Sequence, residues 1–283
     1  TKEQNRGLRD RFKKILYTFF PIRDIDKIFE IFMARENLKL NKRPAIDYMD
    51  KGTYLAIKYF FYGFDHDFSA KYLIIDEMQD FTPVDIYLFK KLWHCPCIVV
   101  GDVNQSIEKN ISDEYLQITA DFLGCKLIKL NKTYRSTKEI AKFANSMIGL
   151  ENIDFVNRHG QEPTVYQTSN QAKKIKELID SECSSFDHIA IICKCNKEAK
   201  ALEKNLKKYV DCSILTEPED YNNRILITTC GTAKGIEFDA VIIPNAVKDN
   251  YHNTIDKNIL YVSSTRALHK LFFVSESEPS TLL

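Results

Sequence analysis

The chain has 283 residues, enough for one large domain or two modest domains with buried cores. With 44% apolar and 28% charged residues, its composition is that of a globular protein and excludes a disordered, fibrous or low-complexity chain. The 40 basic and 39 acidic side chains give a net charge of +1, so any binding of nucleic acid has to come from a local surface.

No apolar run reaches about 18 residues, and no signal-peptide pattern is present. We therefore expect a cytoplasmic protein with no membrane partner. The eight cysteines include several within apolar runs, which is typical of reduced core residues. The pairs Cys95/Cys97 and Cys193/Cys195 lack the second ligand pair that a structural zinc site requires.

Residues 1–62 are expected to be helical. Apolar side chains recur at three- and four-residue spacing from Leu8 to Phe20, and the same period resumes after Pro21 from Ile25 to Phe32. We interpret this segment as part of an accessory helical subdomain.

From residue 72 onward the chain contains short, mostly unbroken apolar runs, several of them followed by a helical pattern. Such runs indicate strands buried on both faces, and their alternation with helices predicts an α/β fold with parallel sheets. The runs are 72–75, 97–100, 127–130, 189–193, 225–228 and 240–243.

Two local features refine this organisation. Ser136 and Glu139 have the spacing of a capping box at the start of a helix. The polar residues 157–163, which include a glycine and a proline, are typical of a linker. We therefore expect one α/β domain at 63–156 and a second at 157–283.

Ligands of parallel α/β sheets collect at the carboxyl ends of the strands, where polar side chains cluster here. Asp76 and Glu77 follow the first strand, and two adjacent acids there suit a Mg²⁺ contact and a general base. A solvent-exposed acidic loop is the alternative that this pattern alone leaves open.

Further candidate residues follow the other strands. Gln105 carries an amide suited to a phosphate oxygen or a water molecule, and Tyr134 and Arg135 combine a stacking ring with a phosphate-binding guanidinium. The block 234–238 precedes a strand, and Arg266 lies on a predicted helix at 261–267. Each of these features alone is also typical of a turn or of a solvated helix face.

Taken together, five blocks resemble the motifs of superfamily 1 helicases of the UvrD/Rep type. They are D-E-x-Q-D at 76–80, G-D-x-x-Q-S at 101–106, Y-R-S at 134–136, T-x-x-x-A-K-G-x-E-F at 229–238 and Y-V-x-x-T-R-A at 261–267. The resemblance implies two RecA-like (P-loop NTPase) domains, the first incomplete, in an ATP-dependent DNA helicase that hydrolyses ATP. Residues 76–83 and 101–105 look closest to the HelD and helicase IV branch, whose Gram-positive HelD members remove RNA polymerase from nucleic acid.

The resemblance also implies ATP and Mg²⁺ as cofactors, with a role for each site residue. Glu77 would act as the general base, and Arg135 and Arg266 would reach the γ-phosphate from the second domain, across a cleft whose closure drives movement. The remaining implied roles are Mg²⁺ binding by Asp76, γ-phosphate sensing by Gln105, adenine stacking by Tyr134, and nucleotide binding by Gly235 and by Glu237, the latter at the ribose hydroxyls.

The sequence departs from this family in ways that bear on activity. No P-loop, G-x-x-x-x-G-K-[ST], precedes Asp76, where the only glycines are Gly7, Gly52 and Gly63. We therefore expect the C-terminal part of a longer motor, completed by an N-terminal P-loop segment and inactive in ATP hydrolysis by itself.

Two further departures concern nucleic acid. After Gln105 the chain lacks the aromatic residue and the Arg-Gly-Ala stretch of the helicases, and the 92 residues between Ser136 and Thr229 leave no room for a large duplex-engaging insertion. Three hypotheses remain open: a translocase on single-stranded or tailed DNA, a HelD-like factor that displaces RNA polymerase, and a non-catalytic RecA-like interaction module.

Overall fold

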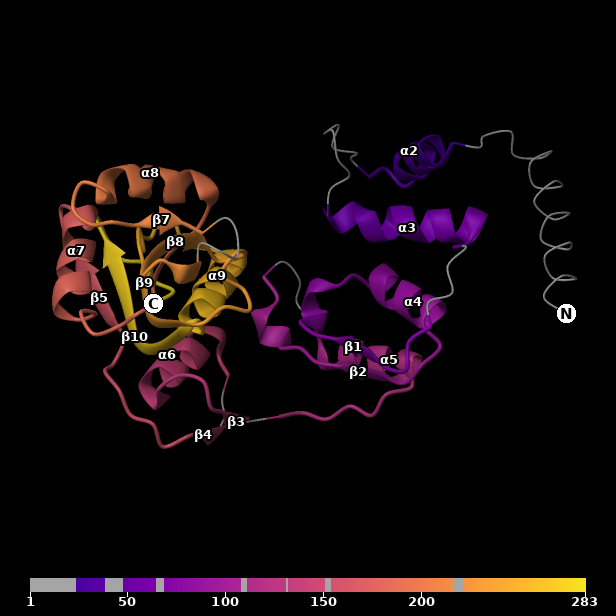
Figure 1. Ribbon diagram of the computed structural model, residues 1–283, viewed down its shortest axis with the longest axis horizontal. Coiled ribbons are helices and arrows are strands. Elements are labelled where there is room, and N and C mark those ends of the chain that lie inside the picture. Colours follow the sequence, from indigo (N-terminus) through magenta and orange to yellow (C-terminus); the bar gives the residue numbers. More distant parts are fainter. Residues whose placement is uncertain are drawn as a thin grey trace, which may run out of the picture. The chain divides into compact units, whose positions relative to one another are not determined.

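The computed structural model describes residues 24–38, 48–64, 69–107, 111–130, 132–150, 154–215 and 221–283 (Figure 1). The chain divides into two compact units, of which unit 1 comprises residues 1–102 and 112–127, and unit 2 comprises residues 103–111 and 128–283. Within the described ranges, no helix has both the length and the apolar character needed to cross a membrane.

The described part of unit 1 combines four α-helices with a pair of parallel strands. Its elements are α2 (Ile25–Arg35), α3 (Tyr48–Tyr62), β1 (Leu73–Ile75), α4 (Pro83–Leu92), β2 (Cys97–Val99) and α5 (Asp113–Leu123). Helix α2 buries Phe29 and Met33, and the ring of Phe29 packs edge-on against Tyr54 of α3 at 5.4 Å. Both helices lie in the range predicted to be helical, whereas residues 1–23 and 39–47 of that range, including Leu8, Phe20 and Pro21, lie outside the described residues.

Helix α4 begins where its sequence specifies a start, immediately after the loop that follows β1. The Thr82 hydroxyl accepts a hydrogen bond from the Asp85 N–H at 3.2 Å, and the Asp85 carboxylate accepts one from the Thr82 N–H at 2.7 Å. Together with Pro83 in the first turn, this capping box fixes the first residue of the helix. It thereby anchors the far end of the acidic loop at 76–80.

The strand predicted at 127–130 does not form. β1 and β2 pair with each other in register, from Leu73 opposite Cys97 to Ile75 opposite Val99. In the described part of the chain, residues 127–130 have no paired strand, and Leu130 is 89% exposed. An apolar run becomes a strand only when a neighbouring strand satisfies its backbone groups, and that partner is lacking here.

Unit 2 is built on a parallel six-stranded sheet with the strand order β5-β10-β9-β6-β8-β7. The strands predicted at 189–193, 225–228 and 240–243 are present as β6, β8 and β9, so the prediction of a mixed α/β fold with parallel sheets is confirmed. The strands are β5 (Thr164–Gln167), β6 (Ile189–Cys193), β7 (Ser213–Ile214), β8 (Ile225–Thr229), β9 (Phe238–Ile243) and β10 (Ala267–Ser275).

Helices cover both faces of this sheet (Figure 1). Ile189, Ile191 and Cys193 of β6 pack on the side of helices α7 (Gln171–Ser181) and α8 (Asn196–Leu206). The alternate residues Ala190 and Ile192 pack on the side of α6 (Lys138–Ile148) and α9 (Thr254–Ser264). Burial on both faces explains why these strands are uninterrupted apolar runs.

Helix α6 packs within unit 2, where Phe143 contacts Phe273 of β10 at 5.5 Å between ring centroids. The short parallel strands β3 (Lys132–Thr133) and β4 (Asp154–Phe155) precede and follow this helix. The boundary predicted between residues 156 and 157 therefore lies inside this unit, and residues 157–163 do not join the two units.

The capping box predicted for α6 is wrong. Thr137 is the N-cap and accepts a hydrogen bond from the Ile140 N–H, whereas Ser136 lies before the cap. The Glu139 carboxylate contacts the His159 ring at 2.7 Å and accepts the Gly160 N–H at 2.8 Å. Glu139 therefore ties residues 159–160 to α6 instead of closing the helix end.

All eight cysteines are free thiols in the structure. Cys183, Cys193, Cys212 and Cys230 are buried, whereas Cys195 at the start of α8 is exposed. Burial raises the pKa of Cys183 and of Cys212 to about 11, so both thiols are protonated at neutral pH.

Candidate functional site

The acidic loop of unit 1 begins at the carboxyl end of β1. The Asp76 side chain is exposed, and its carboxylate accepts a hydrogen bond from the Glu77 N–H at 2.8 Å. Glu77 has a left-handed backbone, with φ of 51° and ψ of 45°. A non-glycine residue in this region costs of order 1 kcal/mol and persists only where surrounding contacts enforce it, as they do at functional sites.

Gln79 supplies the contact that orients Glu77. Its side chain is only 1% exposed, and its amide nitrogen donates a hydrogen bond to the Glu77 carboxylate. The amide oxygen accepts the backbone N–H of Asp102, after β2, at 3.1 Å. Sequence analysis assigned no role to Gln79, although the D-E-x-Q-D block contains it. The sequence feature that could have indicated this role is the uncharged polar Gln79 among the acidic residues of the 76–80 block.

Gly101 makes room for this arrangement. A Cβ atom at residue 101 would lie 2.5 Å from the Gln79 amide oxygen and 2.6 Å from Cγ of Met78. The Met78 N–H donates to the carbonyl of Val100 at 3.0 Å, which brings the two loops against each other. Because of this close approach, only glycine fits at residue 101 without displacing Gln79.

In unit 2, the structure brings Gln105 and Arg266 together. Both side chains are buried, and the Arg266 guanidinium donates a hydrogen bond to the Gln105 amide oxygen. The Arg266 Nε also donates to the Val262 carbonyl at 3.2 Å, and Nη2 donates to the Thr265 hydroxyl at 3.2 Å. The predicted helix at 261–267 ends at Ser264, so Arg266 lies in the turn before β10 and is 1% exposed.

The segment that carries Gln105 is fastened to α9. The Asn258 side-chain amide donates to the backbone carbonyls of Ser106 at 3.3 Å and Ile107 at 3.4 Å. This helix therefore holds residues 105–107 beside Arg266, which follows its C-terminal end. Residues 108–110, which include part of the divergent stretch after Gln105, lie outside the described residues.

A second pair in unit 2 joins Arg135 to Glu237. Their side chains form an ion pair, and both are about 40% exposed (42% and 39%). The Arg135 backbone carbonyl accepts a hydrogen bond from Arg158 at 2.9 Å, which fixes the local chain. Glu237 thus contacts Arg135 in this structure, and its role at the ribose hydroxyls stays a prediction.

The neighbours of this pair are placed for different reasons. Tyr134 projects an exposed ring, with the Lys132 ammonium 5.4 Å from its centroid, and such a ring is free to stack on a base. Gly235 has φ of +78°, and no atom lies within 4 Å of the place that a Cβ would occupy. The turn before β9 therefore needs glycine at residue 235 for its backbone conformation and not for space.

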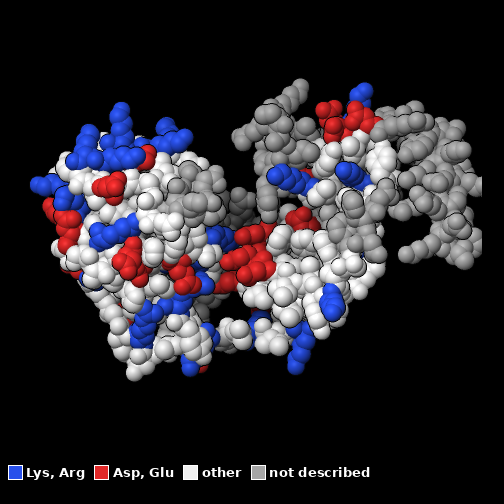
Figure 2. Space-filling view, in the orientation of Figure 1, with Lys and Arg blue, Asp and Glu red and all other residues white. Residues whose placement is uncertain are grey.

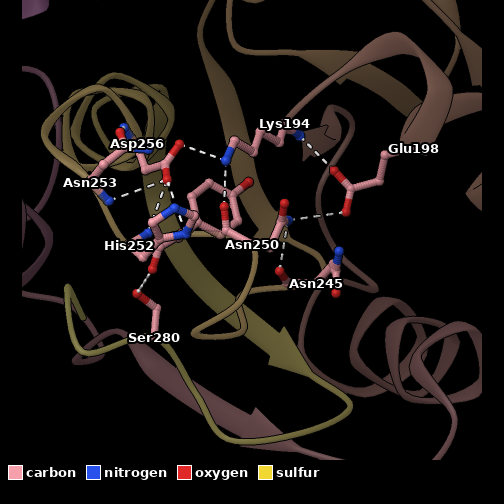
Figure 3. Close-up of polar contacts among 9 residues, drawn as sticks. Lys194, Glu198, Asn245, Asn250, His252, Asn253, Asp256 and Ser280 are labelled. Atoms are coloured by element: carbon pink, nitrogen blue, oxygen red, sulfur yellow. Dashed lines mark hydrogen bonds and ion pairs between the residues drawn. The ribbon is translucent and has the colours of Figure 1, made fainter.

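A buried polar network anchors the N-terminal end of α9 (Figure 3). The Asp256 carboxylate closes a capping box with Asn253, accepts the His252 N–H at 2.9 Å and pairs with the Lys194 ammonium at 2.6 Å. Burial raises the pKa of Asp256, but the hydrogen bonds from Lys194 and from the backbone outweigh burial and hold this pKa below its ordinary value.

The same network continues to α8 (Figure 3). The Glu198 carboxylate accepts the Lys194 N–H at 2.9 Å and the Asn250 amide at 3.5 Å, and burial raises the pKa of Glu198. The Asn250 amide also donates to the carbonyl of Asn245 at 3.0 Å. The loops that follow β6 and β9 are thereby joined to the helix that precedes Arg266. Only their spatial proximity reveals these contacts, and sequence analysis missed them.

The donor set fits Mg²⁺ and a nucleotide. Mg²⁺ keeps several waters and phosphate oxygens, so it needs one or two protein carboxylates, and Asp76 offers an exposed one at a strand end. In the ranges that the structure describes, no group of three or more His, Cys, Asp or Glu side chains is arranged to hold a metal unaided. The structure joins Gln105 to Arg266 and Arg135 to Glu237. That Glu77 faces these arginines stays a prediction, because Glu77 belongs to the other unit.

Comparison with known proteins gives an independent result. Residues 224–274 match the family described as UvrD-like helicase C-terminal domain, a range that includes Glu237 and Arg266. The ATP-dependent DNA helicase Rep of Buchnera aphidicola subsp. Schizaphis graminum is 32% identical over 168 residues, which cover 52% of this chain and 25% of that protein. The ATP-dependent DNA helicase PcrA of Bacillus subtilis is 29% identical over 157 residues, or 49% of this chain and 21% of that protein.

A solved structure is also similar. It is the C-terminal domain of a possible DNA helicase from Lactobacillus plantarum WCFS1, with 31% identity, a TM-score of 0.43, and coverage of 53% of this chain and 91% of that chain. The chain matches a quarter or less of the length of the curated relatives named above. Over about half of its length the chain is thus similar in sequence to proteins named as Rep and PcrA DNA helicases, and residues 224–274 match the UvrD-like helicase C-terminal domain.

Proposed function

We propose that this chain is part of an ATP-dependent superfamily 1 DNA helicase or translocase. In this proposal two RecA-like units couple ATP hydrolysis to movement on nucleic acid or to remodelling of protein–nucleic-acid complexes. The observation that carries the proposal is the position of Glu77, a left-handed glutamate whose carboxylate is held by the buried amide of Gln79. A scaffold has no need to strain a backbone in order to orient one carboxylate, whereas a general base does.

The residues of the chain divide the chemistry between them. ATP with Mg²⁺ supplies the phosphoryl group and neutralises part of its charge. The Glu77 carboxylate accepts a proton from the attacking water, and the Gln105 amide orients that water or a phosphate oxygen. Arg266 and Arg135 place positive charge where the transferred group gains negative charge, and the exposed ring of Tyr134 stacks on adenine.

The contacts of Arg266 and Arg135 in unit 2 bear on how the two arginines would reach a bound nucleotide. In the structure the Arg266 guanidinium donates to Gln105, and the Arg135 guanidinium pairs with Glu237. A phosphate is a stronger partner for a guanidinium than a neutral amide, because both groups then carry charge. We therefore expect nucleotide binding to draw Arg266 away from Gln105.

The 283 residues contain no G-x-x-x-x-G-K-[ST] segment to hold the β- and γ-phosphates. We propose that another segment of the protein supplies it and that this chain alone does not turn over ATP. Phosphate release by the purified chain, with and without single-stranded DNA, tests this point. Turnover that the Glu77→Gln variant abolishes would contradict the need for an added P-loop, and turnover that Glu77→Gln leaves intact would contradict the role of Glu77.

RNA polymerase is a second candidate partner. The resemblance of residues 76–83 and 101–105 to the HelD branch favours it, and so does the short connection between Ser136 and Thr229. Pull-down experiments with RNA polymerase and with single-stranded DNA, both at stated salt, separate the two partners. Salt-sensitive DNA binding without polymerase retention would count against the HelD-like placement.

A further inference from the structure

Five lysines form a continuous stripe on the outer face of α8 and the turn that follows it. These residues, which we call the α8 stripe, are Lys197, Lys200, Lys204, Lys207 and Lys208. Figure 2 shows a dense band of basic side chains over this helix. Their three- and four-residue spacing places them on one face, and a rise of about 1.5 Å per residue spreads them over about 16 Å. For a chain with a net charge of +1, this is a marked local excess of positive charge.

The stripe does not contribute to the hydrophobic core. The opposite face of α8 packs Ala199, Leu202 and Leu206 against the sheet, so all five lysines project into solvent. Lysines three and four residues apart repel one another and destabilise the helix by a few tenths of a kcal/mol per pair. A neighbouring polyanion would relieve this repulsion.

Few acidic groups on the helix itself offset the stripe. Glu203 pairs with Lys207 at 2.8 Å, and Glu198 is turned inward to Asn250 and to the backbone of Lys194. The other four lysines of the stripe form no ion pair with any residue that the structure describes. Their ammonium groups are therefore available to an external anion.

The end of the stripe adjoins a hollow with polar walls. Tyr209, which follows Lys208, exposes 43% of its surface. Lys208 and Tyr209 line a cavity of about 520 Å³ together with Asn170, Gln171 and Asn205, and the lining also includes Glu198 and Glu276. An exposed ring and a set of amides beside a line of cations are the groups that bind an unstacked base and its backbone.

We propose that the α8 stripe binds the phosphate backbone of a single-stranded nucleic acid and that its end, at Tyr209, receives a base. The inference rests on the proposed function and adds a contact surface on the outer face of α8. An acidic protein fits the stripe less well, because protein interfaces are depleted of lysine and centred on apolar or aromatic anchors, whereas a nucleic-acid strand presents a regular line of charges. Lysine binds phosphate as a point charge and needs no special geometry.

The test compares two variants of the full chain that lose equal charge. One carries Lys197→Gln, Lys200→Gln and Lys204→Gln on the stripe, and the control carries Lys173→Gln, Lys176→Gln and Lys248→Gln elsewhere on unit 2. Lysine and glutamine have nearly equal helix propensity, so circular dichroism should show all three proteins equally folded. Binding of a fluorescent single-stranded oligonucleotide is then measured by anisotropy from 50 to 300 mM salt.

Each phosphate contact contributes about 0.7 to the slope of log K against log salt for single strands, so losing three lowers this slope by about 2. If the stripe variant and the wild type bind equally at 1 M salt, the stripe variant binds up to about 100-fold more weakly than the wild type at 0.1 M salt. The control variant binds like the wild type.

Each other outcome has a separate meaning. If both variants have the same slope of log K against log salt, the proposed role of the α8 stripe would be overturned, whereas nucleic-acid binding by the chain would still hold. A wild-type chain that binds no oligonucleotide at any salt would contradict nucleic acid as a partner in the proposed function, and the stripe with it. Poly-L-glutamate serves as a second probe, one that mimics an acidic protein. If the stripe variant loses binding to poly-L-glutamate but binds the oligonucleotide as the wild type does, the proposal would be overturned in favour of an acidic protein partner.

Discussion

The buried ion pair between Lys194 and Asp256 predicts a large effect of one substitution, Lys194→Met. The Asp256 carboxylate is 2% exposed and joins the N-terminal end of α9 to the loop after β6, whereas the Lys194 side chain is 25% exposed. Methionine keeps the length and the apolar stem of lysine but leaves the carboxylate with the backbone donors of His252 and Asn253 and with the His252 ring, whose Nδ1 lies 3.8 Å away. The variant therefore removes the charge partner with little change in packing.

The size of the effect follows from burial. Removing one partner of a fully buried pair costs about 3–5 kcal/mol, because a buried charge is left uncompensated. Water reaches part of Lys194, so we expect a loss of about 2 kcal/mol in the free energy of unfolding of unit 2. The exposed pair Lys207–Glu203 on α8 is a matched control, and Lys207→Met should cost no more than about 0.5 kcal/mol.

The two units allow an internal control. The one tryptophan of the chain, Trp93, follows α4 in unit 1, so its fluorescence reports unfolding of that unit. Urea unfolding of Lys194→Met should shift the transition seen by circular dichroism and leave the transition seen by Trp93 fluorescence in place. An unchanged circular dichroism midpoint would refute the reasoning.

The sign of the pH dependence follows from the lowered pKa of Asp256. A carboxyl whose folded-state pKa lies below its unfolded-state pKa stabilises the fold above the unfolded value, and this contribution is lost as the pH falls through the folded value. The difference between wild type and Lys194→Met should therefore be largest at neutral pH and shrink on acidification. A difference that grows at acid pH would contradict the account.

Three further outcomes are expected. Gly101→Ala should destabilise unit 1 by about 1–3 kcal/mol in urea unfolding followed by Trp93 fluorescence, because the added methyl overlaps Gln79, and an unchanged midpoint would count against the close approach. Glu139 has its pKa lowered to about 2 by hydrogen bonds with His159 and the backbone. Glu139→Gln should therefore lower the melting temperature at pH 7, with the difference fading as the pH falls from 4.5 toward 2, and equal melting temperatures at pH 7 would contradict this role. Ellman's reagent should modify the exposed Cys195 faster than the buried Cys193 in the native chain, and the reverse order would contradict their placement.

Much of the fold of unit 2 was readable from local pattern. β6, β8 and β9 are central strands that are buried on both faces, and such strands have to be unbroken apolar runs. β5 was missed because it is an edge strand in which exposed and half-buried residues alternate. β10 was missed because His269 and Lys270 interrupt its apolar residues. Both side chains are half-buried, and the Lys270 ammonium pairs with the Glu182 carboxylate.

The candidate site divides in the same way. Most of the blocks were located in the sequence because they adjoin a predicted apolar run and combine charged and polar residues, and because the five blocks together resemble helicase motifs. Their pairing was not readable, since Gln105 and Arg266 meet across 161 residues of chain. The same holds for Gln79, whose role depends on a loop that β2 brings beside it. Contacts between loops are set by the packing of the sheet and leave no trace in local spacing.

The most direct measurement is ATP turnover by the protein with its P-loop segment present, comparing wild type with Glu77→Gln in the presence of single-stranded DNA. Loss of a positioned general base lowers a rate by about 10²–10⁴-fold. We predict a fall of that size in kcat with little change in KM for ATP, because glutamine preserves the shape and the contact with Gln79. A Glu77→Gln protein that hydrolyses ATP at the wild-type rate would contradict the account.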